Sequence, residues 1–184
     1  MSPDTSPARS AGEVAGGAGE DCFPTAVREV ARSAGEGNSL TDRIHVVAGA
    51  LYDPHGRVLI TQRPAGKPLA GRWEFPGGKL HEGEEPYPGL VRELREELDV
   101  EVQSAEPLLR YDVEYPGRTI TLDMWLVTSW TGTVRGLDGQ AWKWVEPALL
   151  EREDILEADQ PIVAALVERS RRASVERSAS FDVN

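Results

Sequence analysis

The chain has 184 residues, of which 40% are hydrophobic and 28% are charged, and its formal net charge is −11. This length and composition are typical of a globular protein with one medium-sized domain. A protein that grips a nucleic-acid polymer usually carries a basic surface, so the acidic balance argues against that class. An acidic protein can bind a phosphate ligand when cations lie between the two, so phosphate chemistry here is expected to need a metal ion.

The chain has a single cysteine, Cys22, so no disulfide can form within it. No apolar run approaches the ~20 residues of a membrane-spanning helix. The first residues, Met1 to Thr5, have neither the basic start nor the apolar stretch of a signal peptide. We therefore expect a cytoplasmic protein without a membrane partner, and nothing in the sequence specifies an oligomeric state.

Residues 1–42 are rich in Ala, Gly, Ser, Glu and Pro. Such a segment buries too little apolar surface to offset the entropy lost on ordering, so it is predicted to be a disordered extension. The alternative is a short docking helix between Phe23 and Ala31.

Residues 43–169 show the periodicities and turn signals of a folded domain. The predicted strands are Ile44–Tyr52, Val58–Thr61, Leu108–Tyr115, Thr119–Trp130 and Trp142–Val145, and the predicted helices are Pro86–Leu98 and Pro161–Arg169. A turn signal at 53–56 predicts a hairpin of the first two strands, and Pro116-Gly117 suits a type II turn between the third and fourth. The mixture lacks regular βαβ alternation, which predicts an α/β fold with a mixed sheet. Residues 170–184 are polar and are expected to be a flexible tail.

Three carboxylates, Glu93, Glu96 and Glu97, lie on one face of the helix predicted at 86–98. A solvated helix face is the ordinary interpretation. Like charges at these spacings repel, however, and a helix selected only for stability would alternate them with lysine. The helix also follows Phe75-Pro76-Gly77-Gly78-Lys79, whose glycines let the backbone approach a ligand. Carboxylate oxygens beside such a loop suit Mg²⁺.

The spacing of these residues resembles the Nudix box, whose pattern is G-x5-E-x7-R-E-U-x-E-E-x-G-U with U aliphatic. Gly78, Glu84 and the run from Arg92 to Val100 match every defined position except one. Asp99 stands where the pattern has the glycine that ends the helix. That position often needs a left-handed backbone, which Asp tolerates better than most residues. We expect a modest loss of stability and an intact site.

A wider stretch, from about Val46 to Leu166, resembles the MutT-type branch of the Nudix hydrolases, for example at 62–63, 69–79, 118–122 and 158–161. This resemblance implies a Nudix α/β/α sandwich with a mixed β-sheet and the Nudix loop and helix. It also implies a Mg²⁺-dependent enzyme, with Mn²⁺ as a substitute, that hydrolyses a nucleoside triphosphate. In that branch water attacks the β-phosphorus, and the products are a nucleoside monophosphate and pyrophosphate.

The resemblance also implies roles for individual residues. The expected metal ligands are Gly77 through its carbonyl, Glu84, Glu93, Glu96 and Glu97. The expected catalytic residues are Arg92, Glu93, Glu96 and Asp138. Arg92 is expected to orient a glutamate through charge-assisted hydrogen bonds, and Glu84 to support the loop. Glu93 and Asp138 are alternative general bases, and a plain turn residue is an equally good interpretation of Asp138.

Five further residues are candidate substrate contacts. Arg63, Lys79 and Arg118 are candidates for the phosphates, although each is also a common surface residue. Phe75 is a candidate for stacking on the base, or else a core residue. Asp159 is expected to read the base: an ionised Asp only accepts hydrogen bonds, which suits the amino group of cytosine, whereas a protonated Asp can also read an oxidised purine.

The favoured function is therefore removal of oxidised nucleotides such as 8-oxo-dGTP. One alternative is a pyrophosphohydrolase for CTP or a modified dCTP. A second is a module that binds nucleotides without catalysis, but such modules typically lack the glutamates that this chain has at 93, 96 and 97.

Overall fold

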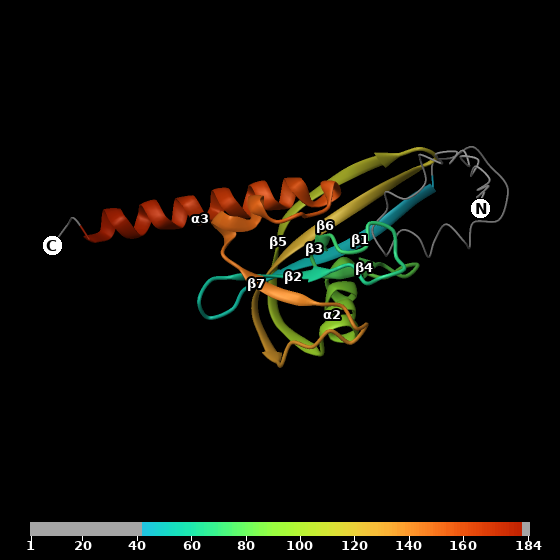
Figure 1. The fold of residues 1–184 in the computed structure, drawn as a ribbon, viewed down its shortest axis with the longest axis horizontal. Helices are drawn as coiled ribbons and strands as arrows, with labels where there is room; N and C mark the ends of the chain where they lie inside the picture. The colour runs from blue at the N-terminus through green and yellow to red at the C-terminus, as the bar shows by residue number, and fades with distance from the viewer. Residues whose placement is uncertain (1–41, 182–184) are drawn as a thin grey trace, which may run out of the picture.

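The computed structural model describes residues 42–181. Its elements are β1 (Asp42–Leu51), β2 (Val58–Gln62), β3 (Trp73–Glu74), β4 (Gly77–Lys79), α2 (Pro86–Leu98), β5 (Val100–Tyr115), β6 (Arg118–Gly132), β7 (Trp142–Val145), the 3₁₀ helices η1 (Pro147–Arg152) and η2 (Glu157–Asp159), and α3 (Gln160–Phe181). Figure 1 shows the strands in the middle of the molecule, with α2 on one side and α3 on the other. This arrangement confirms the predicted α/β/α sandwich.

The strands form two sheets. The four-stranded sheet has the order β4-β1-β6-β5, and the three-stranded sheet has the order β3-β2-β7. In the larger sheet β1 runs parallel to β6, whereas the β1–β4 and β5–β6 pairs are antiparallel. The predicted mixed sheet is thus present.

The predicted hairpin of the first two strands is wrong. β1 and β2 belong to different sheets, and an isolated bridge between Tyr52 and Val58 is what joins their adjacent ends. The reason is that β1 pairs along its whole length with β6, from Asp42 opposite Arg118 to Leu51 opposite Val127, and its other edge is taken by β4. The turn at 53–56 therefore passes the chain from one sheet to the other.

The second predicted hairpin is confirmed, and it is longer than expected. β5 begins at Val100, directly after α2, and pairs with β6 up to Tyr115 opposite Arg118. Gly117 has a φ of 79°, which is the conformation that a type II turn requires at its third residue.

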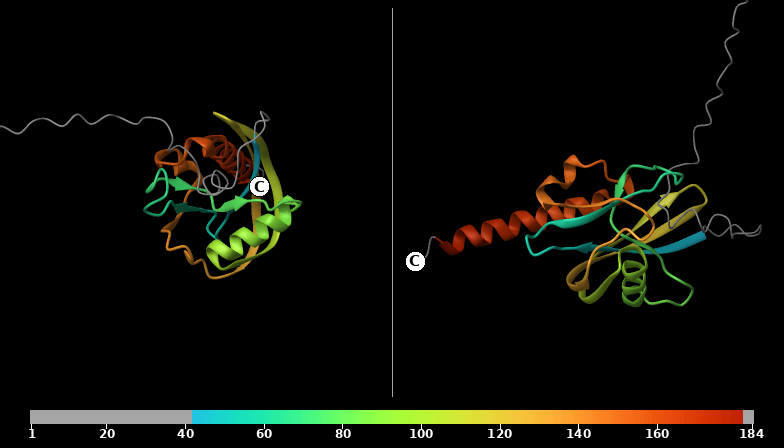
Figure 2. Two further views of the ribbon diagram at one scale, coloured as in Figure 1. Left: turned by 90° about the vertical axis from the view of Figure 1, so that its right-hand side faces the viewer. Right: turned by 60° about the horizontal axis from the view of Figure 1, so that its bottom comes forward.

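The alternation of side chains along β1 explains why the two helices lie on opposite faces of the sheet. Ala48 and Ala50 belong to the core cluster that α3 joins. Val47 and Leu51 belong to the cluster that α2 joins. Figure 2 shows the two helices on either side of the sheet in both views.

The helix predicted at 86–98 has the predicted bounds, and Asp99 ends it in the left-handed conformation, with φ 58° and ψ 37°. The last helix differs from the prediction. α3 runs from Gln160 to Phe181, so residues 170–181 continue it and do not form a separate tail. This stretch holds no glycine or proline and is rich in Ser and Arg, so nothing in it interrupts a helix. The extension and docking helix predicted before residue 42 lie outside the described residues.

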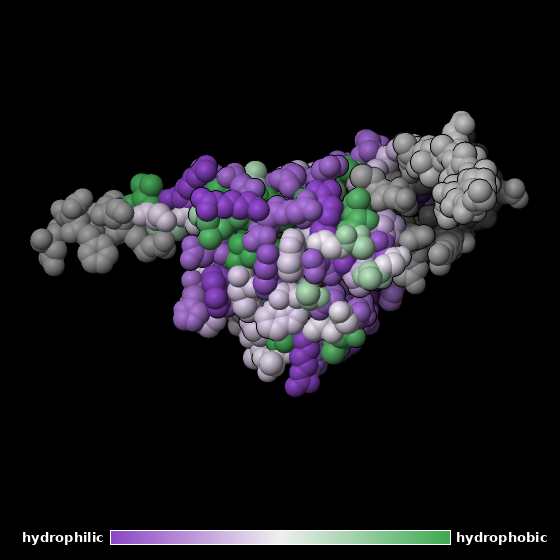
Figure 3. All heavy atoms as spheres, viewed as in Figure 1, coloured by the Kyte–Doolittle hydropathy of each residue, from purple (hydrophilic) through white to green (hydrophobic). Residues whose placement is uncertain are grey.

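The face in Figure 3 is mostly hydrophilic, with hydrophobic residues in small groups, mainly along α3. No helix within the described range has the length and apolar character needed to cross a membrane.

Candidate active site

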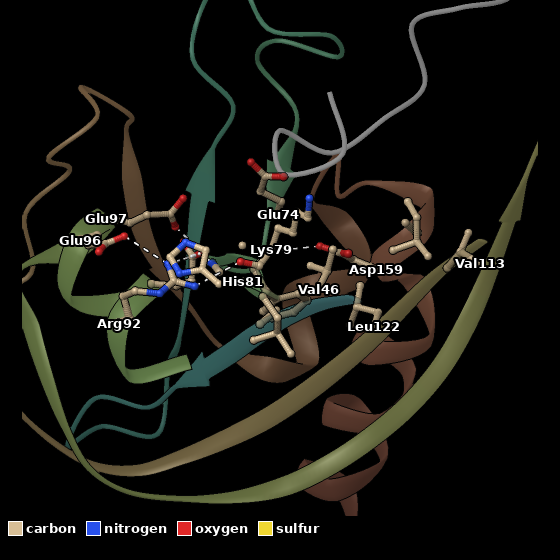
Figure 4. Close-up of a pocket in the computed structure, with 18 of the residues that line it drawn as sticks. Val46, Glu74, Lys79, His81, Arg92, Glu96, Glu97, Val113, Leu122 and Asp159 are labelled. Atoms are coloured by element: carbon tan, nitrogen blue, oxygen red, sulfur yellow. Dashed lines mark hydrogen bonds and ion pairs between the residues drawn. The ribbon is translucent and has the colours of Figure 1, made fainter. Parts of the chain in front are cut away.

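A cavity of about 660 Å³ lies over the four-stranded sheet, beside the β3–β4 segment and the C-terminal half of α2. The sheet supplies apolar side chains such as Val46, Ile120 and Leu122 to its wall. Figure 4 shows Glu96, Glu97 and Arg92 at one end of the cavity and Asp159 at the other. We call these the acidic end and the Asp159 end.

The glycine loop (residues 75–79) is packed closely between β1 and α2. A Cβ on Gly77 would overlap the Val47 carbonyl oxygen, and a Cβ on Gly78 would overlap the carboxyl group of Glu93. Gly77 also has a φ of 151°, which side chains rarely adopt. These close approaches explain why both positions are glycine, and they bring backbone atoms of the loop to the acidic end.

Arg92 organises the carboxylates of the acidic end. Its Nη1 donates to Glu93 Oε1 at 2.8 Å and to Glu96 Oε2 at 3.3 Å. Its Nη2 donates to the Lys79 carbonyl at 3.2 Å, so the guanidinium also joins α2 to β4. The predicted orienting role of Arg92 agrees with these contacts.

Glu84 is the strongest partner of Arg92. Its Oε1 accepts from Arg92 Nε at 2.8 Å, and its Oε2 accepts from Arg92 Nη2 at 2.6 Å and from the His81 amide at 2.8 Å. These bonds, chiefly those from Arg92, lower the pKa of Glu84 to about 2. Glu84 is not among the residues that line the cavity. These contacts are of the kind that support of the loop requires. The expected role of Glu84 as a metal ligand stays a prediction.

Glu97 has surroundings that disfavour its ionised form. Its Oε2 accepts a hydrogen bond from the Gly77 amide at 3.2 Å. Burial, followed by the charges of Glu74 and Glu93, raises its pKa to about 8. Burial likewise raises the pKa of Glu93. A group of half-buried carboxylates that resists ionisation is an arrangement that a cation would stabilise.

The donor chemistry of the acidic end fits a hard divalent cation. Glu93, Glu96 and Glu97 line the cavity together, and they offer only oxygen ligands, as such a cation prefers. Within residues 42–181 no three His, Cys, Asp or Glu side chains already converge as a finished metal site. Arg92 holds two of the three glutamates by ion pairs, so cation binding would compete with those pairs.

Asp138 lies in the loop between β6 and β7 and lines the same cavity. Its amide donates to Gln140 Oε1 at 2.9 Å, and Gln140 Nε2 donates to the Glu97 carbonyl at 3.1 Å. The Leu137 amide donates to the same carbonyl at 2.9 Å. The end of α2 therefore holds this loop in place. Asp138 lies in a turn and also lines the cavity that the carboxylates line, so its role as a general base stays a prediction.

Asp159 and Phe75 form the opposite end of the cavity. Both side chains are buried and both line the cavity. Asp159 Oδ2 accepts a hydrogen bond from the Phe75 amide at 3.1 Å. Burial, followed by the charge of Glu74, raises the pKa of Asp159 to about 7. Phe75 is at once a core residue and a wall of the cavity. The core interpretation is confirmed, and stacking on the base stays a prediction.

Two predicted substrate contacts do not line the cavity. The Arg63 side chain is 0% exposed; its Nε donates to the Pro68 carbonyl at 2.7 Å and its Nη1 to Glu74 Oε2 at 2.7 Å. Burial beneath the loop that follows β2 makes it a structural support for Glu74. Arg118 lies at the β5–β6 turn, opposite Tyr115, where the strand direction carries it away from the acidic end. Lys79 does line the cavity.

Glu74 is a site residue that sequence reasoning missed. It lines the cavity, and burial raises its pKa although Arg63 opposes the shift. The charge of Glu74 also acts on both Glu97 and Asp159. A carboxylate directly before the buried Phe75 and the glycine loop was the available signal.

Comparison with known proteins agrees with this geometry. Residues 42–166 match the family model of the NUDIX domain. The 8-oxo-dGTP diphosphatase of Escherichia coli (strain K12) is 35% identical over 124 residues, which cover 67% of this chain and 96% of that protein. The CTP pyrophosphohydrolase of the same organism is 39% identical over 124 residues, covering 67% of this chain and 91% of that one. A solved MutT structure, from work on Aliivibrio salmonicida and Vibrio cholerae, has a TM-score of 0.63 at 35% identity and covers 70% of this chain and 99% of its own.

The chain belongs to the Nudix family, in its MutT-type branch, and it is a Nudix hydrolase. Enzymes of this family act on nucleotides and generally need a divalent metal. The acidic end of the cavity offers oxygen donors of the kind that such a metal prefers.

Proposed function

We propose that this enzyme is a Mg²⁺-dependent nucleoside triphosphate pyrophosphohydrolase that removes oxidised nucleotides such as 8-oxo-dGTP, with Mn²⁺ as a substitute cation. The observation that carries the proposal is one cavity with glutamates at one end and the buried Asp159 at the other. The acidic end suits a metal-bound triphosphate, and the Asp159 end suits a base. The chain has a single cysteine, which agrees with a protein that acts in the reducing cytoplasm.

The residues that would hold the cation are Glu93, Glu96, Glu97 and the Gly77 carbonyl. A bound Mg²⁺ neutralises phosphate charge and polarises phosphoryl oxygens. Lys79, in the cavity wall, places one further positive charge beside the phosphates. Arg92 keeps the glutamates oriented through the contacts it makes with Glu93 and Glu96.

In the proposed reaction a water oxygen bonds to the β-phosphorus, and the bond from that phosphorus to the α–β bridging oxygen breaks. The nucleoside monophosphate leaves with the bridging oxygen, and pyrophosphate carries the oxygen from water. A carboxylate takes the proton from the water. Glu93 and Asp138 are both candidates for this base, because both line the cavity.

A second substrate class is supported by Asp159. Its Oδ2 already accepts the Phe75 amide hydrogen bond, which leaves Oδ1 for a base. An ionised carboxylate only accepts, and it suits the amino group of cytosine; a neutral carboxyl also donates and suits an oxidised purine. The similarity to a CTP pyrophosphohydrolase makes CTP or a modified dCTP the alternative substrate.

The test is a substrate panel of 8-oxo-dGTP, dGTP, CTP, 5-methyl-dCTP and ADP-ribose, incubated with Mg²⁺. Pyrophosphate and orthophosphate are measured separately. We expect pyrophosphate with the highest kcat/KM for 8-oxo-dGTP; a higher value for CTP would select the alternative. Orthophosphate alone would overturn attack at the β-phosphorus, and no turnover of any nucleotide would overturn the proposal.

A further inference from the structure

A second cavity of about 290 Å³ adjoins the candidate active site. The two cavities share Val113, Tyr115 and Ala158 as wall residues. In Figure 4 Val113 lies beyond Asp159, away from the acidic end. The second cavity therefore extends the end of the site where we place the base, and it does not extend the end where we place the phosphates.

The walls of the second cavity are mainly apolar and aromatic. Leu69, Leu156 and Pro161 line it on one side, and Tyr111 lines it from β5. The Tyr111 hydroxyl donates to the Ala158 carbonyl at 2.6 Å, so the hydroxyl is engaged and the ring remains as apolar surface. Such walls suit an apolar or aromatic group and offer little to a phosphate or a sugar.

The two carboxylates of this cavity already have cationic partners. Asp112 accepts from Arg43 at 2.8 Å and from Thr121 at 2.7 Å. Glu157 lies 3.8 Å from an Arg72 nitrogen and has a side chain that is 78% exposed. Neither carboxylate therefore needs a cationic ligand. The apolar walls determine which ligand the cavity accepts.

Leu69 provides an independent indication that this wall is used. It has a φ of 56°, and within residues 42–181 it shares a positive φ with just one other non-glycine residue, Asp99. A left-handed backbone is unfavourable for a residue with a side chain, and glycine would avoid that cost. Strained residues that persist tend to be found at ligand sites. The leucine side chain at this position faces the second cavity.

We propose that the second cavity is a subsite for an apolar substituent on the base of the substrate. This inference rests on the proposed function, because it requires a base at the Asp159 end. A dry cavity of ~150 Å³ accommodates benzene, so a cavity of about 290 Å³ has room for a benzyl group. The enzyme would then accept nucleotides with alkyl or arylmethyl adducts on the exocyclic amine as well as small oxidised bases.

The first experiment compares dCTP and dATP with analogues that carry benzyl on the exocyclic amine. The measured quantity is the ratio of kcat/KM for the benzyl analogue to kcat/KM for its parent. In the wild-type enzyme we expect this ratio to stay above about 0.1 for at least one base, a loss no larger than the ~10-fold at the lower end of what a hydrophobic pocket achieves against one added group. Leu69→Trp, which fills the subsite, is expected to lower the ratio at least ~10-fold.

Ala70→Trp is the matched control, since Ala70 is the exposed neighbour of Leu69 and lines neither cavity. We expect it to leave the ratio unchanged. A wild-type ratio below about 0.01 for both bases would overturn the subsite by itself, even if Leu69→Trp failed to fold. Equal ratios in the wild type and in a folded Leu69→Trp variant would overturn it as well.

Calorimetric titration with dAMP and N6-benzyl-dAMP separates this inference from the proposed function, because it needs no turnover. The benzyl monophosphate is expected to bind at least as tightly as dAMP, and Leu69→Trp should weaken only the benzyl ligand. This result without hydrolysis of any triphosphate would leave the subsite standing and overturn the proposed function. Hydrolysis of the parent nucleotides, together with much weaker binding of the benzyl ligand than of dAMP, would support the proposed function and overturn the subsite.

Discussion

Glu97 connects the glycine loop to the acidic end, through its hydrogen bond from the Gly77 amide at 3.2 Å. Its carboxylate is also the one with the most crowded negative surroundings, since Glu74, Glu93 and Asp138 all raise its pKa. A residue in this position contributes little to the stability of the metal-free fold. Its expected contribution is to catalysis, by holding the cation.

Glu97→Gln tests that role. Glutamine keeps the shape and the hydrogen-bond acceptor but loses the charge, so we expect kcat to fall by several orders of magnitude. The melting temperature should stay equal or rise, because a repelled carboxylate has been removed. Glu101→Gln, at an exposed position of β5, is the control and should behave like the wild type. Near-normal activity of Glu97→Gln would show the metal assignment to be wrong.

Asp159 gives a prediction for the dependence of stability on pH. Burial, with Glu74, raises its pKa from the ordinary 3.8 to about 7. The folded state thus holds a proton that the unfolded chain has lost, and the contribution of Asp159 to stability is full below 3.8 and is lost as pH rises through about 7. Asn is neutral throughout and still accepts from the Phe75 amide.

Melting temperatures of the wild type and Asp159→Asn are therefore expected to diverge with pH. From about pH 5 to about pH 8 the variant should gain several degrees relative to the wild type. Asp42→Asn, at an exposed residue of β1, is the control for removal of a carboxylate and should track the wild type. Parallel curves for Asp159→Asn and the wild type would show that Asp159 is ionised throughout.

Sequence and structure agree best for residues whose neighbours are close in the chain. Glu93, Glu96 and Glu97 could be placed on one face because helix geometry relates residues three and four apart. Arg63 could not be placed, because its burial depends on the loop that folds over it and on its ion pair with Glu74. Both are tertiary features, and an arginine at a strand end is otherwise a surface residue.

Among the elements, α2 has bounds that the local sequence determines most simply. Its end is defined by the left-handed Asp99, whose amide donates to the Arg95 carbonyl at 3.1 Å. Asp99 therefore adopts the left-handed conformation that was expected at this position, where the family pattern has glycine. The Asp99 side chain forms an exposed ion pair with Arg135 at 3.2 Å, which is worth at most about 1 kcal/mol.

Asp99→Gly is expected to raise the free energy of unfolding by up to ~1 kcal/mol, because relief of backbone strain outweighs the lost ion pair and the added entropy of glycine in the unfolded chain. Asp99→Ala loses the same ion pair but retains a side chain, so it should be less stable than the wild type. Urea denaturation of the three proteins measures the order. Activity should change little. A glycine variant no more stable than the alanine variant would mean that the left-handed backbone carries no strain.

The sheet elements show where local signals mislead. The turn at 53–56 was a correct signal of a chain reversal, yet β1 and β2 lie in different sheets. Local sequence specifies a turn, but the choice of strand partner depends on what else competes for each edge. β6 and β4 occupy both edges of β1, and these partners are distant in the sequence. The β5–β6 hairpin was predictable because its partners are joined directly at Pro116-Gly117.

At the scale of the whole molecule, the net charge of −11 favours cations in general, and the acidic end should favour divalent cations in particular. A ligand that binds only the folded state stabilises it, by about 2.7 kcal/mol at a free concentration of roughly 100 times its Kd. For a domain of this size that corresponds to a rise in melting temperature of roughly 5–10 °C. EDTA should reverse the rise completely.

The control separates specific binding from general screening of the negative charge. NaCl at the ionic strength of the MgCl₂ solution should raise the melting temperature much less, because screening acts on every exposed charge alike. Glu97→Gln should lose most of the Mg²⁺-specific rise and keep the response to NaCl. If Glu97→Gln keeps the full Mg²⁺ rise, the cation binds elsewhere on this acidic protein. If MgCl₂ and NaCl act equally on the wild type, the folded enzyme has no selective divalent site without its nucleotide, and the phosphates must then complete the ligand set.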